Sequence, residues 1–120
     1  MATRSRIAVE LEDGTIKSVY CHWDGYPEGV GQDLLNKSFS STREVEDFID
    51  EGSRSTVDES YYVKYGESRG EELEEPDVHN SVDDYYNSDI EEYGYLFTKE
   101  GKWYVKSAYG SIDDLVKNVI

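Results

Sequence analysis

The sequence contains a single cysteine, two prolines and two histidines among its 120 residues. The lone cysteine, Cys21, excludes an intramolecular disulfide and a zinc site built from cysteines, and it favours a reducing compartment. No stretch approaches the roughly 18 apolar residues of a membrane span, and Met1 to Arg6 carries no apolar signal segment. We therefore expect a cytoplasmic protein in which Cys21 is a small buried hydrophobe.

Basic residues are also scarce. Twelve Lys and Arg stand against 27 Asp and Glu, for a formal net charge of −15, and residues 67–92 hold eleven carboxylates but only one cation, Arg69. A field of this sign repels nucleic acids and anionic membranes and attracts a basic protein, unless it serves solubility alone. The acidic residues that we expect to contact a basic partner are Glu71, Glu72, Glu74, Glu75, Asp83 and Asp84.

Apolar alternation and turn residues predict two β-hairpins. The first spans residues 5–23 with Asp13-Gly14 at its tip, and the second joins residues 93–98 to 102–107 through Glu100-Gly101. Tyr61 to Tyr65 has the composition of a further strand.

Helical spacing predicts four short helices. One lies around Val30 to Leu35, two begin after Ser41 and Ser81 as capping residues, and the last covers Ile112 to Ile120 behind Ser111. The remainder of residues 67–92 reads as a long acidic loop. The chain is therefore expected to be one α+β domain over residues 1–120, with an antiparallel sheet of two hairpins plus a further strand and helices packed on one face.

The highest density of chemically specialised residues lies at positions 20–31, which read Tyr-Cys-His-Trp-Asp-Gly-Tyr-Pro-Glu-Gly-Val-Gly. A surface turn needs glycine, proline or aspartate for its backbone angles, but it does not need His22 or Trp23. Large aromatic side chains with a polar group are typical of binding sites. We call residues 20–31 the motif loop and expect it to form a recognition face.

Two segments of the chain resemble a family of small proteins from tailed bacteriophages and prophages. The segments are the motif loop and residues 65–71, Tyr-Gly-Glu-Ser-Arg-Gly-Glu. The resemblance runs from the N-terminus to about Glu71 and more loosely through Tyr93 to Tyr104. Most of the family is uncharacterised, so the resemblance implies an accessory protein in the cytoplasm of an infected bacterium and implies no activity.

The leading hypothesis is a non-enzymatic protein that acts against the host by capturing a small nucleotide-like or phosphate-bearing ligand, such as a defence signal. Glycines 25, 29 and 31 precede an expected helix, so their N–H groups are candidates to hold an anion, although no Gly-x-Gly-x-x-Gly or Walker pattern is present. Arginine binds phosphate bidentately, and aromatic rings stack on bases. The candidate ligand-binding residues are Arg4, His22, Trp23, Asp24, Tyr26 and Arg69.

Two alternatives stay open. In the first, the acidic residues imitate the phosphates of a nucleic acid, and the protein is a decoy that inhibits a host nucleic-acid-binding protein. In the second, the protein is an enzyme that uses His22 and Asp24, which point the same way if the strand continues. No further carboxylate, serine or metal-ligand spacing supports catalysis, so we expect no catalytic residue, cofactor or metal. Direct nucleic-acid and membrane partners are not expected.

Overall fold

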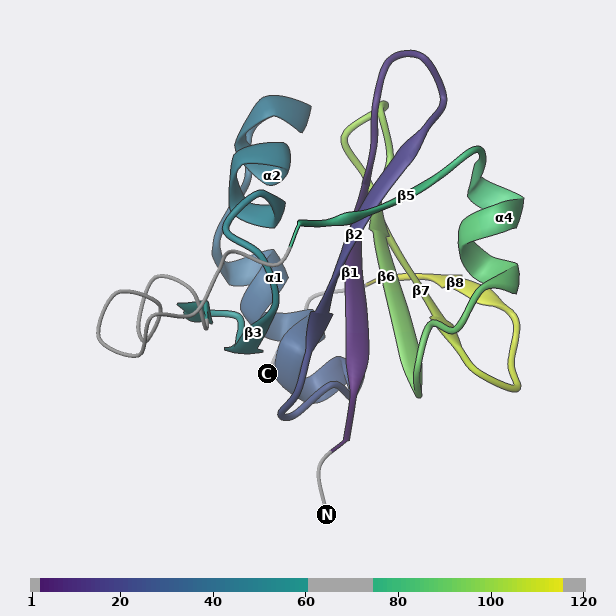
Figure 1. Cartoon of the computed structure of the whole chain (residues 1–120). Coiled ribbons are helices and arrows are strands. Elements are labelled where there is room, and N and C mark those ends of the chain that lie inside the picture. Colours follow the sequence, from purple (N-terminus) through teal and green to yellow (C-terminus); the bar gives the residue numbers. More distant parts are fainter. Residues whose placement is uncertain (1–2, 61–74, 116–120) are drawn as a thin grey trace.

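A mixed β-sheet forms the centre of the computed structural model, which describes residues 3–60 and 75–115 (Figure 1). The strand order is β4-β3-β2-β1-β6-β7-β8. Strand β5 stands outside this order and pairs with β2, along the same edge of β2 as β3. The strands are β1 (Ser5–Glu10), β2 (Ile16–Cys21), β3 (Arg54–Thr56), β4 (Glu59–Ser60), β5 (Asp77–His79), β6 (Tyr93–Phe97), β7 (Trp103–Ser107) and β8 (Ile112–Asp114). The helices are the π-helix η1 (Pro27–Gly31) and the α-helices α1 (Gln32–Asn36), α2 (Thr42–Ile49) and α4 (Val82–Asn87).

Both predicted hairpins are confirmed. β1 and β2 pair antiparallel around a turn in which Gly14 has a φ of 88°, and the Asp13 carboxylate accepts bonds from the N–H and hydroxyl of Thr15. β6 and β7 pair antiparallel around Gly101, whose φ is 85°. Left-handed backbone of this kind favours glycine, and this preference made both turns readable from the sequence.

Two helix caps are confirmed as well. The Ser41 hydroxyl accepts the N–H of Glu44 at 3.2 Å, and the Ser81 hydroxyl accepts the N–H of Asp84 at 3.1 Å. The helix expected around Val30 to Leu35 is present as η1 followed by α1. Local hydrogen-bond chemistry therefore fixes where the helices after Ser41 and Ser81 begin.

The expectation of a purely antiparallel sheet is wrong. β1 pairs parallel with β6, in a register that places Ile7 beside Tyr95, and β2 pairs parallel with β3. β1 consequently lies inside the sheet between two strands, and Ile7, Ala8 and Val9 are all 0% exposed. Alternation at positions 7–11 identified a strand but did not reveal that both of its faces are covered.

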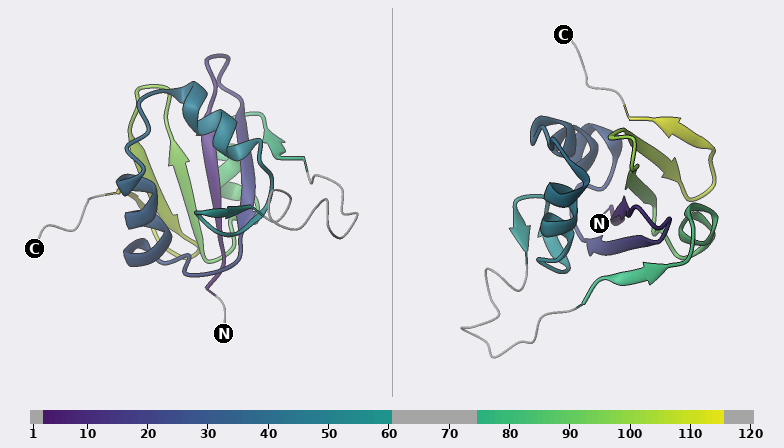
Figure 2. Two further views of the ribbon diagram at one scale, coloured as in Figure 1. Left: turned by 90° about the vertical axis from the view of Figure 1, so that its left-hand side faces the viewer. Right: turned by 90° about the horizontal axis from the view of Figure 1, so that it is seen from above.

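The expectation that the helices pack on one face is also wrong. α2 packs through Phe48 and Ile49 onto the face that holds Val9, whereas α4 packs through Tyr85 onto the opposite face, which holds Ala8. Figure 2 shows the two helical layers on either side of the sheet. α4 packs on this second face because the apolar ring of Tyr85 is buried there. The mainly acidic sequence around Tyr85 gave no indication of that burial.

Three further segments differ from the expectation or lie beyond the described residues. Ile112–Asp114 forms β8, an edge strand on β7, where a terminal helix was expected, and residues 116–120 lie outside the described part. The expected strand Tyr61 to Tyr65 lies outside it too. Asp77–His79 forms β5 within the interval expected to be a loop. Among the described residues, no helix is both long and apolar enough to cross a membrane.

Candidate functional site

The motif loop leaves β2 at Cys21, and its backbone is tied to three other segments. The N–H of Trp23 donates to the carbonyl of Ser55 at 2.9 Å, and the N–H of Gly25 donates to the carbonyl of Thr3 at 2.8 Å. The carbonyl of Gly25 accepts the hydroxyl of Tyr95, a buried residue of β6, at 2.6 Å. These bonds to β3, the N-terminal segment and β6 preorganise the loop.

Close packing against backbone oxygens requires glycine at positions 25 and 29 of the loop. A Cβ on Gly25 would lie 2.8 Å from the carbonyl oxygen of Thr3, and one on Gly29 would collide with the carbonyl oxygen of Asp24. A Cβ on Gly31 would lie 2.9 Å from the Cδ1 of Leu115. Glycine therefore serves here to let neighbouring atoms approach closely.

Three N–H groups between Gly25 and Val30 already have acceptors within the protein. Besides Gly25, the N–H of Gly29 donates to the carbonyl of Tyr26 at 2.9 Å, and that of Val30 donates to the carbonyl of Asp24 at 2.7 Å. These donors are occupied, so an anion held by the backbone, as at a phosphate-binding loop, would have to displace internal bonds.

Four side chains of the loop face solvent, those of Trp23, Asp24, Tyr26 and Glu28. Trp23 is 47% exposed and Tyr26 is 39% exposed, and Asp24 lies exposed between them. Asp24 has a φ of 56°, a left-handed conformation that aspartate and asparagine adopt more readily than most residues. Its carboxylate accepts the Tyr26 hydroxyl at 3.2 Å, and this hydrogen bond raises the pKa of Tyr26.

His22 and Asp24 have separate partners. The Nδ1 of His22 lies 2.6 Å from the hydroxyl of Tyr20, and its ring meets the Trp23 ring edge-on at a centroid distance of 4.6 Å. Within residues 3–60 and 75–115, the side-chain hydrogen bonds of His22 and Asp24 run to Tyr20 and Tyr26 and not to each other. This geometry gives no support to an acid–base pair.

Cys21 is buried, as expected, and its thiol lies 3.9 Å from the carbonyl oxygen of Ser55. Burial raises the pKa of the thiol to about 11. A thiol with so high a pKa is a poor nucleophile at neutral pH.

The electrostatic surroundings of the loop are acidic. Glu28 is exposed beside Asp24, and the pKa of nearby Asp33 is raised by burial and then by the charges of Asp58 and Asp24. Such a field opposes the approach of a phosphate group and favours a neutral or cationic one.

Of the remaining predicted ligand-binding residues, Arg4 lies exposed next to the loop's anchor at Thr3 and pairs with Glu91 at 3.8 Å, while Arg69 lies outside the described residues. Of the predicted partner-binding residues, Asp83 and Asp84 are exposed in the first turn of α4, and Glu75 is exposed before β5. Glu71, Glu72 and Glu74 lie outside the described residues.

Comparison with protein-family models, with curated proteins and with solved structures found no match for this chain. In the described part of the chain, no group of three or more His, Cys, Asp or Glu side chains is placed to hold a metal ion.

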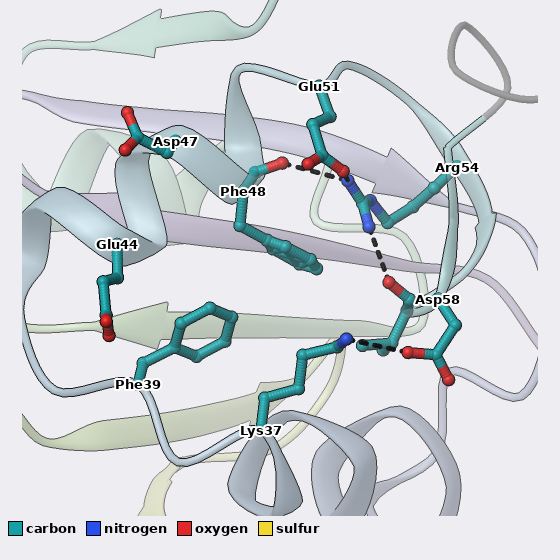
Figure 3. Close-up of a pocket in the computed structure, with 9 residues that line it drawn as sticks. Lys37, Phe39, Glu44, Asp47, Phe48, Glu51, Arg54 and Asp58 are labelled. Atoms are coloured by element: carbon teal, nitrogen blue, oxygen red, sulfur yellow. Dashed lines mark hydrogen bonds and ion pairs between the residues drawn. The ribbon is translucent and has the colours of Figure 1, made fainter.

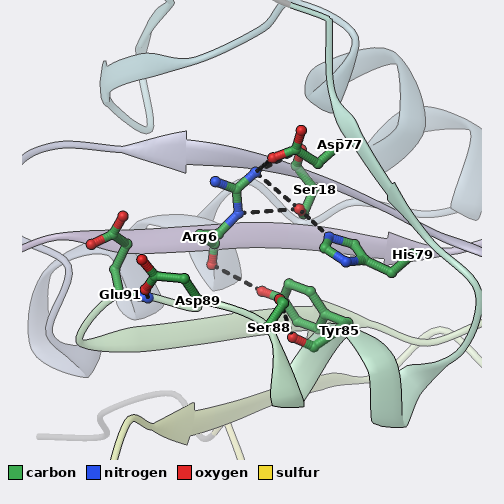
Figure 4. A network of polar contacts seen from close by, with 8 residues as sticks. All are labelled: Arg6, Ser18, Asp77, His79, Tyr85, Ser88, Asp89 and Glu91. Carbon is green, nitrogen blue, oxygen red and sulfur yellow. Dashed lines mark hydrogen bonds and ion pairs between the residues drawn. The ribbon is translucent and has the colours of Figure 1, made fainter.

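Sequence reasoning missed a polar network on the α4 side of the sheet (Figure 4). The guanidinium of Arg6 donates to the hydroxyl of buried Ser18 at 3.1 Å and to the carboxylate of Asp77 at 2.8 Å. The Ser18 hydroxyl lies 2.9 Å from the Nε2 of His79. The network joins β1 and β2 to β5, and no spacing in the sequence marks it, because strand pairing alone brings these residues together.

Proposed function

We propose that this chain is a non-enzymatic binding protein whose motif loop takes up a planar, nucleotide-like ligand. The observation that carries the proposal is the exposure of Trp23 and Tyr26 on a loop whose backbone is held by hydrogen bonds to three segments. An aromatic side chain on a fixed backbone loses little conformational entropy when it stacks against a ligand.

The chemistry of the loop favours a base over a phosphate. The N–H donors of Gly25, Gly29 and Val30 are occupied, and the carboxylates of Asp24 and Glu28 repel an anion. The Asp24 carboxylate is an acceptor suited to the N–H groups on the edge of a nucleobase. We therefore assign stacking to Trp23 and Tyr26 and edge recognition to Asp24.

The setting of this activity follows from the resemblance to phage proteins. A small protein that captures a nucleotide-like defence signal in an infected bacterium would act by lowering the free concentration of that signal. No enzymatic step is needed for this role.

Tryptophan fluorescence tests the proposal directly, because the two tryptophans have opposite environments. Trp23 is exposed, whereas Trp103 is 6% exposed and reports on the fold. Titration with the common nucleosides and their monophosphates is expected to quench Trp23, with each nucleoside binding at least as tightly as its monophosphate. Saturable quenching that survives in a Trp23→Phe variant would assign binding elsewhere, and the absence of binding by every compound would overturn the proposal.

An Asp24→Asn variant separates recognition from folding. Asparagine accepts the left-handed backbone at this position, so the melting temperature should stay within a few degrees, since a surface change costs about 0.5 kcal/mol or less. Ligand affinity should fall because the amide replaces one acceptor oxygen with a donor.

The acidic decoy is a second candidate, favoured by the exposure of Asp83 and Asp84 in the first turn of α4. A decoy binds its basic partner with an affinity that falls steeply with salt. Neutralising Glu71, Glu72, Glu74 and Glu75 together would then weaken activity more than replacing Trp23 and Arg69 together. The ligand-capture proposal predicts the opposite ranking.

A further inference from the structure

A groove of about 410 Å³ opens between α2 and the segment from Arg54 to Asp58, in the part of the chain that the structure describes (Figure 3). This volume lies within the range of functional binding clefts, roughly 300–1,000 Å³. The groove is separate from the side chains of the motif loop, so an inference drawn from it goes beyond ligand capture.

Two phenyl rings form the apolar wall of the groove. The rings of Phe39 and Phe48 lie 5.3 Å apart, and Phe39 also packs 6.2 Å from the ring of Trp103 in the core. Val57 lines the groove from the opposite side. Phe48 is buried with the Arg54 guanidinium 3.8 Å from its ring centroid, whereas Phe39 is half-buried, so an aliphatic chain in the groove would cover the exposed part of Phe39.

The rim of the groove is acidic. Four carboxylates and two cations line it, which leaves a net charge of −2. One of the cations, Arg54, is only 2% exposed, and the other, Lys37, is paired with a rim carboxylate at 2.8 Å. The four carboxylates are those of Glu44, Asp47, Glu51 and Asp58.

Internal bonds orient these carboxylates without removing them from solvent. The side chain of Asp58 is 73% exposed in its pair with Lys37, and that of Asp47 is 64% exposed in its pair with Arg43. Glu44 is held by the N–H and hydroxyl of Ser40. Exposed ion pairs contribute little to stability, so a partner's cation can replace the internal one at small cost.

The guanidinium of Arg54 is buried at the groove and connects its two sides. Its guanidinium donates to the carbonyls of Val57 and Phe48, at 2.6 and 2.9 Å, which holds the two sides of the groove at a fixed separation. Its Nε has no hydrogen-bond partner among the described residues. A buried donor without an acceptor is costly, and the other bonds of the guanidinium, which include one to the rim carboxylate of Glu51 at 3.0 Å, offset this cost.

We infer that this groove docks a basic segment of a partner protein. An Arg or Lys side chain of that segment lays its aliphatic stem over Phe39 and pairs its charged end with Asp47 or Asp58. The net charge of −15 of the whole chain attracts such a partner over longer distances.

A peptide titration with charge-matched variants tests the inference. The probe is a short peptide of alternating arginine and alanine, followed by fluorescence anisotropy and by amide chemical shifts of the protein in roughly 0.15 M salt. The rim variant is Asp47→Asn/Asp58→Asn, and the control is Glu100→Gln/Asp113→Asn, which removes two exposed carboxylates outside the groove lining and changes the net charge equally.

The expected result is about a tenfold loss of affinity in the rim variant, little change in the control, and shifts concentrated around Phe39 and Val57 in the unaltered protein. Equal losses in the two variants would mean general charge attraction and would overturn the inference. Spermine that binds as tightly as the peptide would overturn it as well, because a small cation would then suffice. Melting temperatures of both variants confirm that each is folded.

Discussion

The hydroxyl of Tyr95 donates to the carbonyl oxygen of Gly25 across 2.6 Å, although 70 positions separate the two residues in the chain. Tyr95 is 0% exposed, and burial raises the pKa of its phenol, so the hydroxyl stays protonated as the donor. The central strand β6 thereby fixes the turn that presents Trp23 and Tyr26.

Replacing Tyr95 with Phe tests this link. The change leaves the carbonyl of Gly25 without its donor, and an unsatisfied buried group costs about 1–3 kcal/mol. The free energy of unfolding in urea should fall by that amount, and nucleoside quenching of Trp23 should weaken. Tyr109→Phe is the matched control, because Tyr109 is fully exposed, and a comparable loss in that variant would contradict the assigned role.

The glycines of the motif loop make a second prediction possible. Gly29→Ala places a methyl group against the carbonyl oxygen of Asp24, which accepts the N–H of Val30, so this bond should break and amide exchange at Val30 should accelerate. Gly14→Ala is the comparison, because Gly14 has open space around it but a positive φ. That variant should lose about 1–2 kcal/mol of stability from backbone strain and leave exchange at Val30 unchanged.

The third prediction concerns pH. The pKa of His79 is lowered by burial and then by Arg6, against smaller opposite effects of Asp77 and Asp84. The unfolded chain therefore binds a proton at this histidine before the folded protein does, and the free energy of unfolding should decrease as the pH falls below about 6.5. Urea unfolding between pH 7.5 and 5.5 measures this dependence.

The hydrogen bonds of His79 also predict that the free energy of unfolding decreases as the pH falls. The Ser18 hydroxyl accepts from Arg6 and has one proton to donate, so it donates to the Nε2 of neutral His79. Protonated His79 removes that acceptor. A His79→Gln variant should show a flatter pH dependence, and exposed Asn80→Gln should retain the original one. An unchanged slope in His79→Gln would mean that other groups carry the effect.

The buried thiol gives a fourth prediction. Because burial raises the pKa of Cys21 to about 11 and covers its sulfur, alkylation by iodoacetamide at pH 8 should be at least about 100-fold slower in the native protein than in urea. Mass spectrometry follows the reaction. Rapid native labelling would show that β2 and β3 separate readily in solution.

Local chemistry was predictable from the sequence, and pairing at a distance was not. Asp13-Gly14 indicated its hairpin, and Ser41 and Ser81 indicated where their helices begin. Each signal was readable because its hydrogen bonds form within a few residues of the chain. The parallel pairing of β1 with β6 left no such signal. Ile112 shows the same limit, since its helical spacing was outweighed by an available edge of β7.

The candidate site was likewise predictable from the sequence only in part. Exposure of Trp23 and Tyr26 follows from their place in a turn, but the occupied N–H groups of the loop depend on Thr3 and on contacts between backbone atoms. The acidic groove around Arg54 was not predicted, because its walls come from separate segments. An arginine within a polar stretch gives no sequence signal that it will be buried.

The place of β1 inside the sheet sets an order of events during synthesis. The β1–β2 hairpin can form as soon as its own residues have left the ribosome, but the other edge of β1 pairs with β6, which is translated far later. Until then, Ile7 and Val9 lie on a strand with unpaired N–H and carbonyl groups and an uncovered apolar surface. The nascent chain therefore passes through an interval in which a strand that ends inside the sheet is open to aggregation and to capture by chaperones.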